Sequence, residues 1–130
     1  MRERVERFFV DFGKAVKNLE TAIDTAIDEL DMDGTIKRFE LCYELSWKLV
    51  KEYLADKGVI TRNPRDCFKE AFTNSLIKNE DVWIKMLEDR NYLVHTYTFE
   101  ESRKIFEHIK DLYLSEFKHL YRMVKESDIA

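Results

Sequence analysis

Apolar residues recur at intervals of three and four over residues 5–30, and this spacing constrains the fold more than any other feature of the chain. The positions are Val5, Phe8, Phe9, Phe12, Val16, Leu19, Ile23, Ala26, Ile27 and Leu30. Such intervals place side chains on one face of an α-helix, whereas strand side chains alternate with a period of two. The spacing therefore predicts a long amphipathic helix at the start of the chain.

A second helix follows with a wider apolar face. Residues 31–34 are predicted to interrupt the helical pattern, with Asp33 placed to cap the next helix. The apolar pattern then resumes from Ile36 to Leu54, and Gly58 matches a C-terminal stop. Because its apolar residues cover more than half of the circumference, we expect this helix to contact several neighbours.

Three more helices are predicted from their start signals. Asn63 and Pro64 supply an N-cap followed by a proline at the first helical position. Asn79 precedes two acidic residues that suit a first helical turn. Thr98 begins a capping-box sequence, Thr-Phe-Glu-Glu. We expect a short helix over residues 64–76, a fourth helix from residue 80 to residue 95 or 96, and a last helix over residues 99–124.

These segments predict an all-α fold. With 3 Gly and 1 Pro in 130 residues, the chain has little turn chemistry and favours long helices with short connections. We expect one domain over residues 1–130, an antiparallel up-and-down four-helix bundle with one additional short helix. The aromatic residues of the first and last helices fit core packing and a dimer interface about equally well: Phe8, Phe9, Phe12, Tyr113, Phe117 and Tyr121.

Charge and cysteine content restrict the partners. A net charge of −4 argues against coating DNA or an anionic membrane through bulk electrostatics, although a local phosphate site stays open. We therefore expect no membrane and no DNA partner.

Cys42 and Cys67 fit reduced packing thiols, and no metal site or cofactor is expected. Because no apolar run has the length of a signal or membrane span, a cytoplasmic location is expected.

One stretch carries candidate chemistry, from Arg90 to Tyr97. Projected at about 100° per residue, Arg90 falls in the middle of the apolar face of its helix. A guanidinium there requires a carboxylate or an anionic ligand. In the structural interpretation, Glu40 or Glu44 of the second helix supplies that carboxylate.

In the functional interpretation, this stretch surrounds a phosphodiester. RNA cleavage without a metal needs proton transfer and a cation that offsets charge on the phosphoryl oxygens. His95 suits proton transfer and Arg90 suits the charge role, while Asn91 could orient the phosphate or the imidazole. One Arg and one His are few for this task, so a two-fold dimer would assemble a fuller site. Tyr97 lies beside the capping box and the free backbone donors of the last helix, which could bind an anion, but its residue type and position favour an aromatic plug at a helix corner.

The sequence also resembles a known family over essentially its full length. The matching segments are Arg38-Phe39-Glu40, Tyr43-Glu44-Leu45-Ser46-Trp47-Lys48-Leu49, Asn63-Pro64-Arg65, Ala71-Phe72, Trp83, Met86-Leu87 and Arg90-Asn91-x3-His95-Thr96-Tyr97. This ordered set is similar to the HEPN superfamily, and within it to the nucleotidyltransferase substrate-binding branch. The resemblance is far more specific than the Arg-x4-His spacing alone.

The resemblance implies a dimeric four-helix bundle that acts with a separate minimal nucleotidyltransferase (MNT). It implies a toxin-type RNase with Arg90 and His95 as the catalytic pair, Asn91 as the accompanying polar residue, and neutralisation by the partner. In some pairs neutralisation attaches AMP to the tyrosine that corresponds to Tyr97. Other members are nucleotide-binding or substrate-binding subunits without catalysis, and a purely structural helical adaptor is the third alternative.

Overall fold

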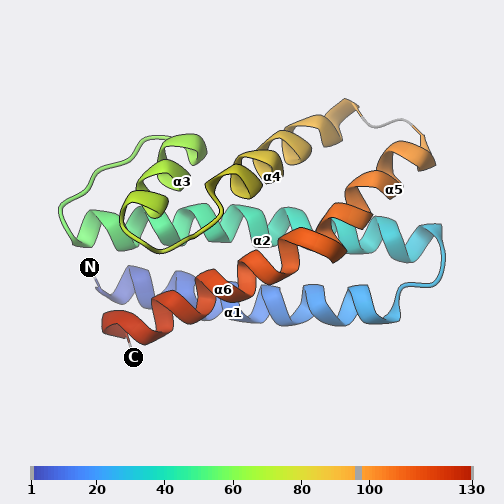
Figure 1. The fold of residues 1–130 in the computed structure, drawn as a ribbon. Coiled ribbons are helices and arrows are strands. Elements are labelled where there is room, and N and C mark those ends of the chain that lie inside the picture. The colour runs from blue at the N-terminus through green and yellow to red at the C-terminus, as the bar shows by residue number, and fades with distance from the viewer. Residues whose placement is uncertain (1, 96–97, 130) are drawn as a thin grey trace.

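The computed structural model describes residues 2–95 and 98–129, and every regular element among them is helical (Figure 1). The α-helices are α1 (Arg2–Thr25), α2 (Glu29–Asp56), α3 (Pro64–Thr73), α4 (Glu80–Tyr92), α5 (Phe99–His108) and α6 (Leu114–Val124). Three short segments adjoin them: the 3₁₀ turn η1 (Leu93–His95) and the π-helical turns η2 (Ile109–Tyr113) and η3 (Lys125–Ile129). Together α5, η2 and α6 form the last helix predicted from the sequence.

The long helices run antiparallel to their neighbours in sequence. Figure 1 shows α1 and α2 side by side, α4 returning along α2 after the short α3, and α5 to α6 crossing back toward the N-terminal end. Helix α2 contacts α1, α3, α5 and α6, as its wide apolar face predicted. The predicted all-α bundle of four main helices and one short helix is confirmed. None of the described helices combines the length and the apolar character needed to cross a membrane.

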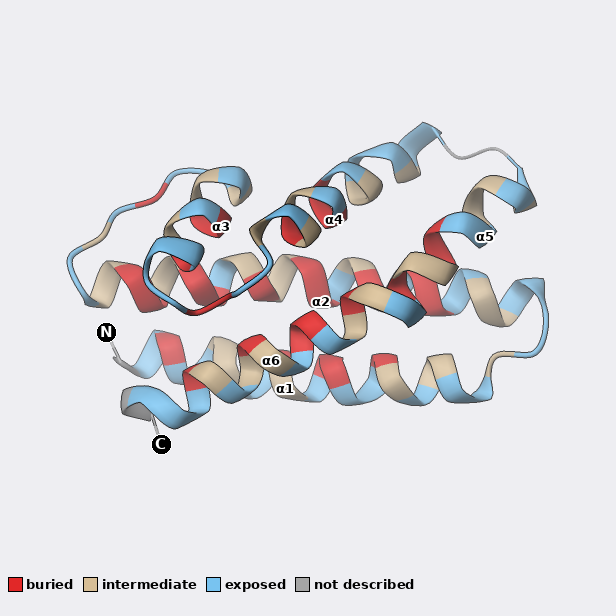
Figure 2. Ribbon diagram, in the orientation of Figure 1, coloured by how far each residue is buried: buried red, intermediate tan, exposed pale blue. Residues whose placement is uncertain are grey.

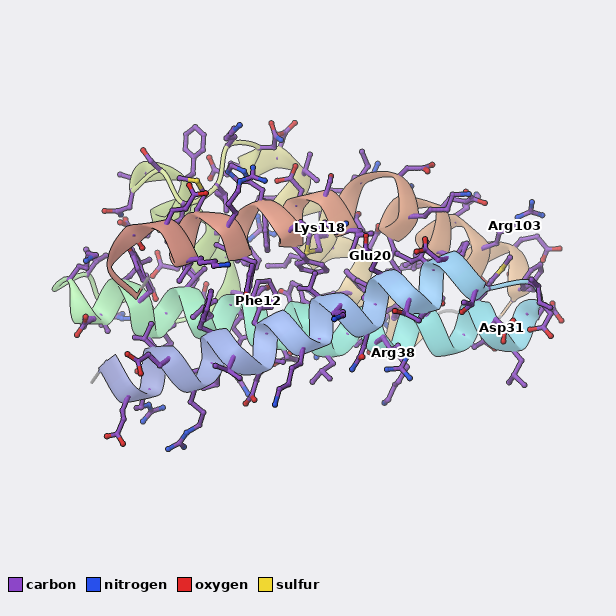
Figure 3. The ribbon with its side chains drawn as sticks, turned by 90° about the horizontal axis from the view of Figure 1, so that it is seen from below. Phe12, Glu20, Asp31, Arg38, Arg103 and Lys118 are labelled. Atoms are coloured by element: carbon purple, nitrogen blue, oxygen red, sulfur yellow. The ribbon has the colours of Figure 1, made fainter. Side chains whose placement is uncertain are left out.

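Aromatic rings from four helices fill the centre of the bundle. Phe117 of α6 lies between Phe12, Phe39 and Trp83, with ring centroids 5.9, 6.1 and 5.7 Å away. Figure 3 shows Phe12 pointing from α1 toward the other helices. All four rings have no exposed surface, so they contribute much of the hydrophobic stabilisation of the core.

The aromatic residues of the first and last helices find partners within one chain. Phe12, Tyr113 and Phe117 are buried, and Phe9 stacks on Tyr121 with ring centroids 4.6 Å apart. An ion pair between Lys118 and Glu20 joins the same two helices at the surface (Figure 3). Core packing therefore accounts for most of these rings, and the homodimer stays a prediction.

The turn between α1 and α2 lies earlier than the sequence predicted. Helix α1 ends at Thr25, and Asp28, not Asp33, caps α2 by accepting a hydrogen bond from the Asp31 backbone N–H at 2.8 Å. The Asp31 carboxylate in turn accepts the Ile27 N–H at 3.0 Å. Gly34 belongs to the segment that was predicted to interrupt the helical pattern, but it lies inside α2. A glycine in a helix costs roughly 0.5–1 kcal/mol, and the reciprocal aspartate cap offsets that amount.

This placement of Gly34 makes it a site for stabilisation. A Cβ atom at Gly34 would meet no atom within 4 Å. The Gly34→Ala substitution is therefore expected to raise the free energy of unfolding by about 0.5–1 kcal/mol, because it removes backbone freedom from the unfolded chain. Chemical denaturation of the two proteins measures the difference.

Gly58 provides the matched control. It follows α2 with φ of +85°, a left-handed conformation that disfavours residues with a Cβ atom. Gly58→Ala is expected to lower the free energy of unfolding by about 1–2 kcal/mol. Equal effects of the two substitutions would show that Gly34 does not lie in a regular helix.

The predicted end of α3 was wrong, whereas α4 begins after Asn79 as predicted. Helix α3 ends at Thr73, not at Leu76, and Leu76 is buried in the connection that follows. Asn79 stands at the N-cap position of α4 but makes no capping hydrogen bond. Its amide donates instead to the carboxylate of Glu116, which also accepts the indole N–H of Trp83 at 3.1 Å. A tertiary hydrogen bond has replaced the local cap.

Candidate functional site

Arg90 lies in the last turn of α4 and is held by two residues of α2. Its Nη2 atom donates to Oε1 of Glu44 at 3.1 Å, and its guanidinium carbon lies 5.8 Å from the centre of the Tyr43 ring. The side chain is 36% exposed, while its Nε atom is buried without a hydrogen-bond partner in the described part of the chain. The guanidinium is thus oriented by the protein and still accessible to an anion.

Glu44 is shared among three groups. Besides Arg90, its carboxylate accepts the indole N–H of Trp47 at 3.2 Å and lies 4.0 Å from the Lys48 ammonium. Of the two carboxylates predicted to meet Arg90, Glu44 makes the contact. Glu40, one turn earlier on α2, lines a separate small groove beside Leu93 and Val94. The shared carboxylate leaves net positive charge around Arg90.

The helix winds more tightly after the end of α4, and this change of winding alters which side chains are exposed. The α-helix ends at Tyr92 and continues as the 3₁₀ turn η1, which has three residues per turn. A regular helix would have placed Val94 on the apolar face with Arg90, but Val94 is 70% exposed. Asn91 and His95 are also exposed, as the outer end of α4 is in Figure 2. The fourth helix, predicted to reach residue 95 or 96, therefore keeps its α-helical winding only to Tyr92.

His95 ends the 3₁₀ turn and makes no hydrogen bond to Arg90. Both side chains lie at the α4 end of the bundle, one on each side of the transition from α-helix to 3₁₀ turn. Tyr97, the predicted modification site, lies outside the described residues. Just beyond it, the predicted capping box is present: Thr98 accepts from the Glu101 N–H, and the Glu101 side chain accepts from the Thr98 N–H.

A buried hydrogen-bond network fixes the turn that carries Arg90. The preceding residue, Asp89, accepts through one oxygen from the Tyr113 hydroxyl at 2.5 Å and bonds the His108 Nδ1 at 2.7 Å. Tyr113 has no exposed surface, and burial and this hydrogen bond raise the pKa of its hydroxyl, which keeps its proton. The network ties the end of α4 to the last helix and restricts the direction of Arg90.

The π-helical turn η2 explains why two residues five apart meet one carboxylate. In a regular α-helix, His108 and Tyr113 would point about 140° apart. In the π-helical segment, hydrogen bonds run from residue i to i+5, so the wider turn brings such residues toward the same side. Because apolar spacing predicts a regular helix over residues 99–124, the sequence gives no sign of this network.

A cavity of about 390 Å³ adjoins Arg90 on the side of α3. We call it the α2–α3 pocket; its lining residues are Tyr43, Glu44, Trp47, Asn63, Pro64, Arg65, Leu87, Arg90 and Asn91. It therefore includes two of the three residues predicted as catalytic, and His95 is not among them. Of the three basic residues near Asn63 in the sequence, Arg62, Arg65 and Lys69, Arg65 lines the pocket.

Comparison with known proteins gives a family match. The model of the family described as "Nucleotidyltransferase substrate binding protein like" matches residues 7–126. A Haemophilus influenzae protein named "Probable ribonuclease HepT" is 30% identical over 98 residues. That match covers 72% of this chain and 66% of the relative, slightly less than two thirds of its length.

Solved structures share the fold. A Thermus thermophilus protein is 26% identical, with a TM-score of 0.80 over 86% of this chain and 98% of that one. A tri-AMPylated Shewanella oneidensis HEPN toxin, solved in complex with an MNT antitoxin, is 21% identical with a TM-score of 0.78 and covers 98% and 100% of the two chains. A Haemophilus influenzae substrate-binding domain of a nucleotidyltransferase is 24% identical with a TM-score of 0.71 and covers 94% and 97%.

Proposed function

The chain belongs to the family of nucleotidyltransferase substrate-binding-like proteins, and we propose that it is the toxin of a HEPN and MNT pair and cleaves RNA through Arg90 and His95. The observation that carries this proposal is that Arg90 is held in place by neighbouring side chains and is still partly exposed. Glu44 and Tyr43 hold its guanidinium in place, yet it is partly exposed at the end of α4 where His95 is also exposed. A fixed, accessible cation near an imidazole suits a phosphodiester.

In the proposed reaction, the 2′-oxygen of a ribose attacks the adjacent phosphorus as its proton passes to a base. The bond from phosphorus to the 5′-oxygen breaks, and that oxygen receives a proton. The products are a 2′,3′-cyclic phosphate and a 5′-hydroxyl. His95 transfers a proton, Arg90 offsets the charge on the phosphoryl oxygens, and Asn91 donates to the phosphate. A homodimer would supply the second proton-transfer group from the His95 of the other copy.

A second function is favoured by one observation. The α2–α3 pocket contains Arg90 and Asn91 but not His95, which suits a subunit that binds a nucleotide without cleaving it. This alternative predicts that nucleotide binding persists in His95→Ala and that turnover requires the nucleotidyltransferase partner.

We propose further that the MNT partner neutralises the toxin by attaching AMP to Tyr97. The tyrosine oxygen would attack the α-phosphorus of ATP and release pyrophosphate. After co-expression with the partner, the intact mass of the chain is expected to rise in units of one AMP, and Tyr97→Phe is expected to abolish the rise. Mass spectrometry of the purified chain makes the measurement.

Tyr92 is the matched control for this experiment. It is an exposed tyrosine of the same segment whose hydroxyl donates to Glu101 at 2.6 Å. Tyr92→Phe is expected to keep the full mass increase. A mass increase that persists in Tyr97→Phe and disappears in Tyr92→Phe would place the modification on Tyr92 and contradict the proposal.

A further inference from the structure

The α2–α3 pocket has the size and chemistry of a small-ligand site. Its volume of about 390 Å³ falls in the range of roughly 300–1,000 Å³ typical of such sites. Three walls form it: one face of α2, the first residues of α3 and the last turns of α4. The pocket therefore opens directly beside Arg90, which the proposed function places on the scissile phosphate.

Two guanidinium groups give the pocket a positive charge. Arg65 at the start of α3 is exposed and makes no ion pair within the described chain, while Arg90 shares the Glu44 carboxylate. Both cations act on the Tyr43 phenol at the pocket wall. Burial raises the pKa of Tyr43 to about 12, with Arg90 and Arg65 acting in the opposite direction. Two cations facing one carboxylate leave a net attraction for an anion.

Local hydrogen bonds occupy several backbone donors around the start of α3. Pro64 has no N–H, and the Asn63 side chain already accepts from the Asp66 N–H at 2.9 Å. The Asp66 carboxylate accepts the Arg62 N–H at 3.2 Å. We therefore expect the side chains of Arg65 and Arg90 to supply most of the attraction for an anion in the pocket.

An aromatic surface lies next to these cations. Trp47 is half-buried, and its indole is held by the hydrogen bond to Glu44. Glu44 thus positions both Trp47 and Arg90 in the same pocket. Nucleic-acid bases stack on such aromatic side chains, with a contribution of about 1–3 kcal/mol per base that depends little on sequence. A positive groove with an aromatic platform suits single-stranded RNA.

We infer that the α2–α3 pocket is a subsite for the nucleotide next to the cleaved bond of single-stranded RNA, with its base against Trp47 and its phosphate between Arg65 and Arg90. The inference rests on the proposed function, because Arg90 is common to both. It adds Arg65 and Trp47 as binding residues that neither the Arg-x4-His motif nor its tyrosine includes.

The test measures binding of a strand that the protein cannot cleave. A fluorescein-labelled, fully 2′-O-methylated oligoribonucleotide lacks the attacking hydroxyl, and its affinity for the full chain is measured by anisotropy. Arg65→Gln is expected to weaken binding about tenfold, since it removes a charged hydrogen bond to phosphate. Arg62 lies three residues before Arg65 in the sequence and does not line the pocket. Arg62→Gln removes the same charge as Arg65→Gln and is expected to change the affinity less than twofold.

A spectroscopic signal locates the strand. Trp83 is fully buried, so quenching of tryptophan emission on binding should come from Trp47 and disappear in Trp47→Phe. Equal losses of affinity in the Arg62 and Arg65 variants, or no loss in either, would overturn the subsite. So would quenching that is unchanged in Trp47→Phe.

The two proposals fail in distinguishable ways. Arg65-dependent binding of the methylated strand, with no cleavage of ordinary RNA by the wild-type chain, would overturn the RNase function and leave the α2–α3 pocket as a binding site for single-stranded RNA without a cleaved bond beside it. Cleavage of RNA that depends on His95, combined with equal affinities of the Arg62 and Arg65 variants, would overturn the subsite alone.

Discussion

The His95→Ala variant is expected to cleave RNA about 10²–10⁴ times more slowly than the wild-type chain, the usual contribution of a positioned proton-transfer group. His95 is the histidine of the exposed, described end of α4 and η1, and an imidazole ring can both accept and donate a proton. Because His95 is exposed and makes no hydrogen bond within the described chain, its removal should leave the fold unchanged. The rate is measured with a labelled single-stranded oligoribonucleotide.

His119 of α6 serves as the matched histidine control. It lies outside the candidate site, and its Nδ1 contacts Arg122 of the same helix at 3.1 Å. His119→Ala is expected to keep the cleavage rate within about twofold, because this partly buried side chain does not line the candidate site. A His95→Ala protein that is folded by circular dichroism and cleaves at the wild-type rate would exclude His95 from the reaction.

The Asp89→Ala variant is expected to lose about 2–3 kcal/mol of unfolding free energy. The substitution leaves the fully buried Tyr113 hydroxyl without its acceptor and removes the bond to His108. An unsatisfied buried polar group costs about 1–3 kcal/mol, and His108 recovers part of its loss because it can reach water. The variant should also cleave RNA more slowly, since Asp89 positions the turn that carries Arg90 without touching the substrate.

Two comparisons isolate this effect, both by chemical denaturation. Asp111→Ala removes an exposed aspartate from the π-helical turn and is expected to change stability by less than about 0.5 kcal/mol. Tyr113→Phe removes the hydroxyl itself, so its effect and that of Asp89→Ala should be less than additive in the double variant. Additive losses would show that the hydrogen bond to Asp89 does not hold Tyr113.

The spacing of apolar residues was sufficient to predict the helices. Where a predicted helix boundary was wrong, local hydrogen bonds had set the actual boundary. The three-four spacing continues through Ile27 and Leu30, yet both side chains are exposed around the turn after α1. The reciprocal cap of Asp28 and Asp31 sets that boundary. Apolar spacing reports a face, whereas the end of a helix depends on a few hydrogen bonds.

The candidate site was less predictable, because its geometry departs from a regular helix in two places. The 3₁₀ turn after Tyr92 redirects Val94 and His95, and the π-helical turn brings His108 and Tyr113 to Asp89. Such changes of winding have no simple sequence signal. The sequence did predict that Arg90 meets either a carboxylate of α2 or an anionic ligand, because the apolar spacing places Arg90 on the inner face of its helix. Glu44 supplies that carboxylate.

The central claim is that the chain cleaves RNA by attack of the 2′-hydroxyl, with Arg90 and His95 as the acting groups. The direct measurement uses protein from cell-free synthesis without the MNT partner, a 5′-labelled single-stranded RNA, and excess chelator. The account predicts products with 2′,3′-cyclic phosphate and 5′-hydroxyl ends from the wild-type chain, and none from Arg90→Met or His95→Ala. Products with 3′-hydroxyl and 5′-phosphate ends, or wild-type cleavage no greater than that of His95→Ala, would contradict it.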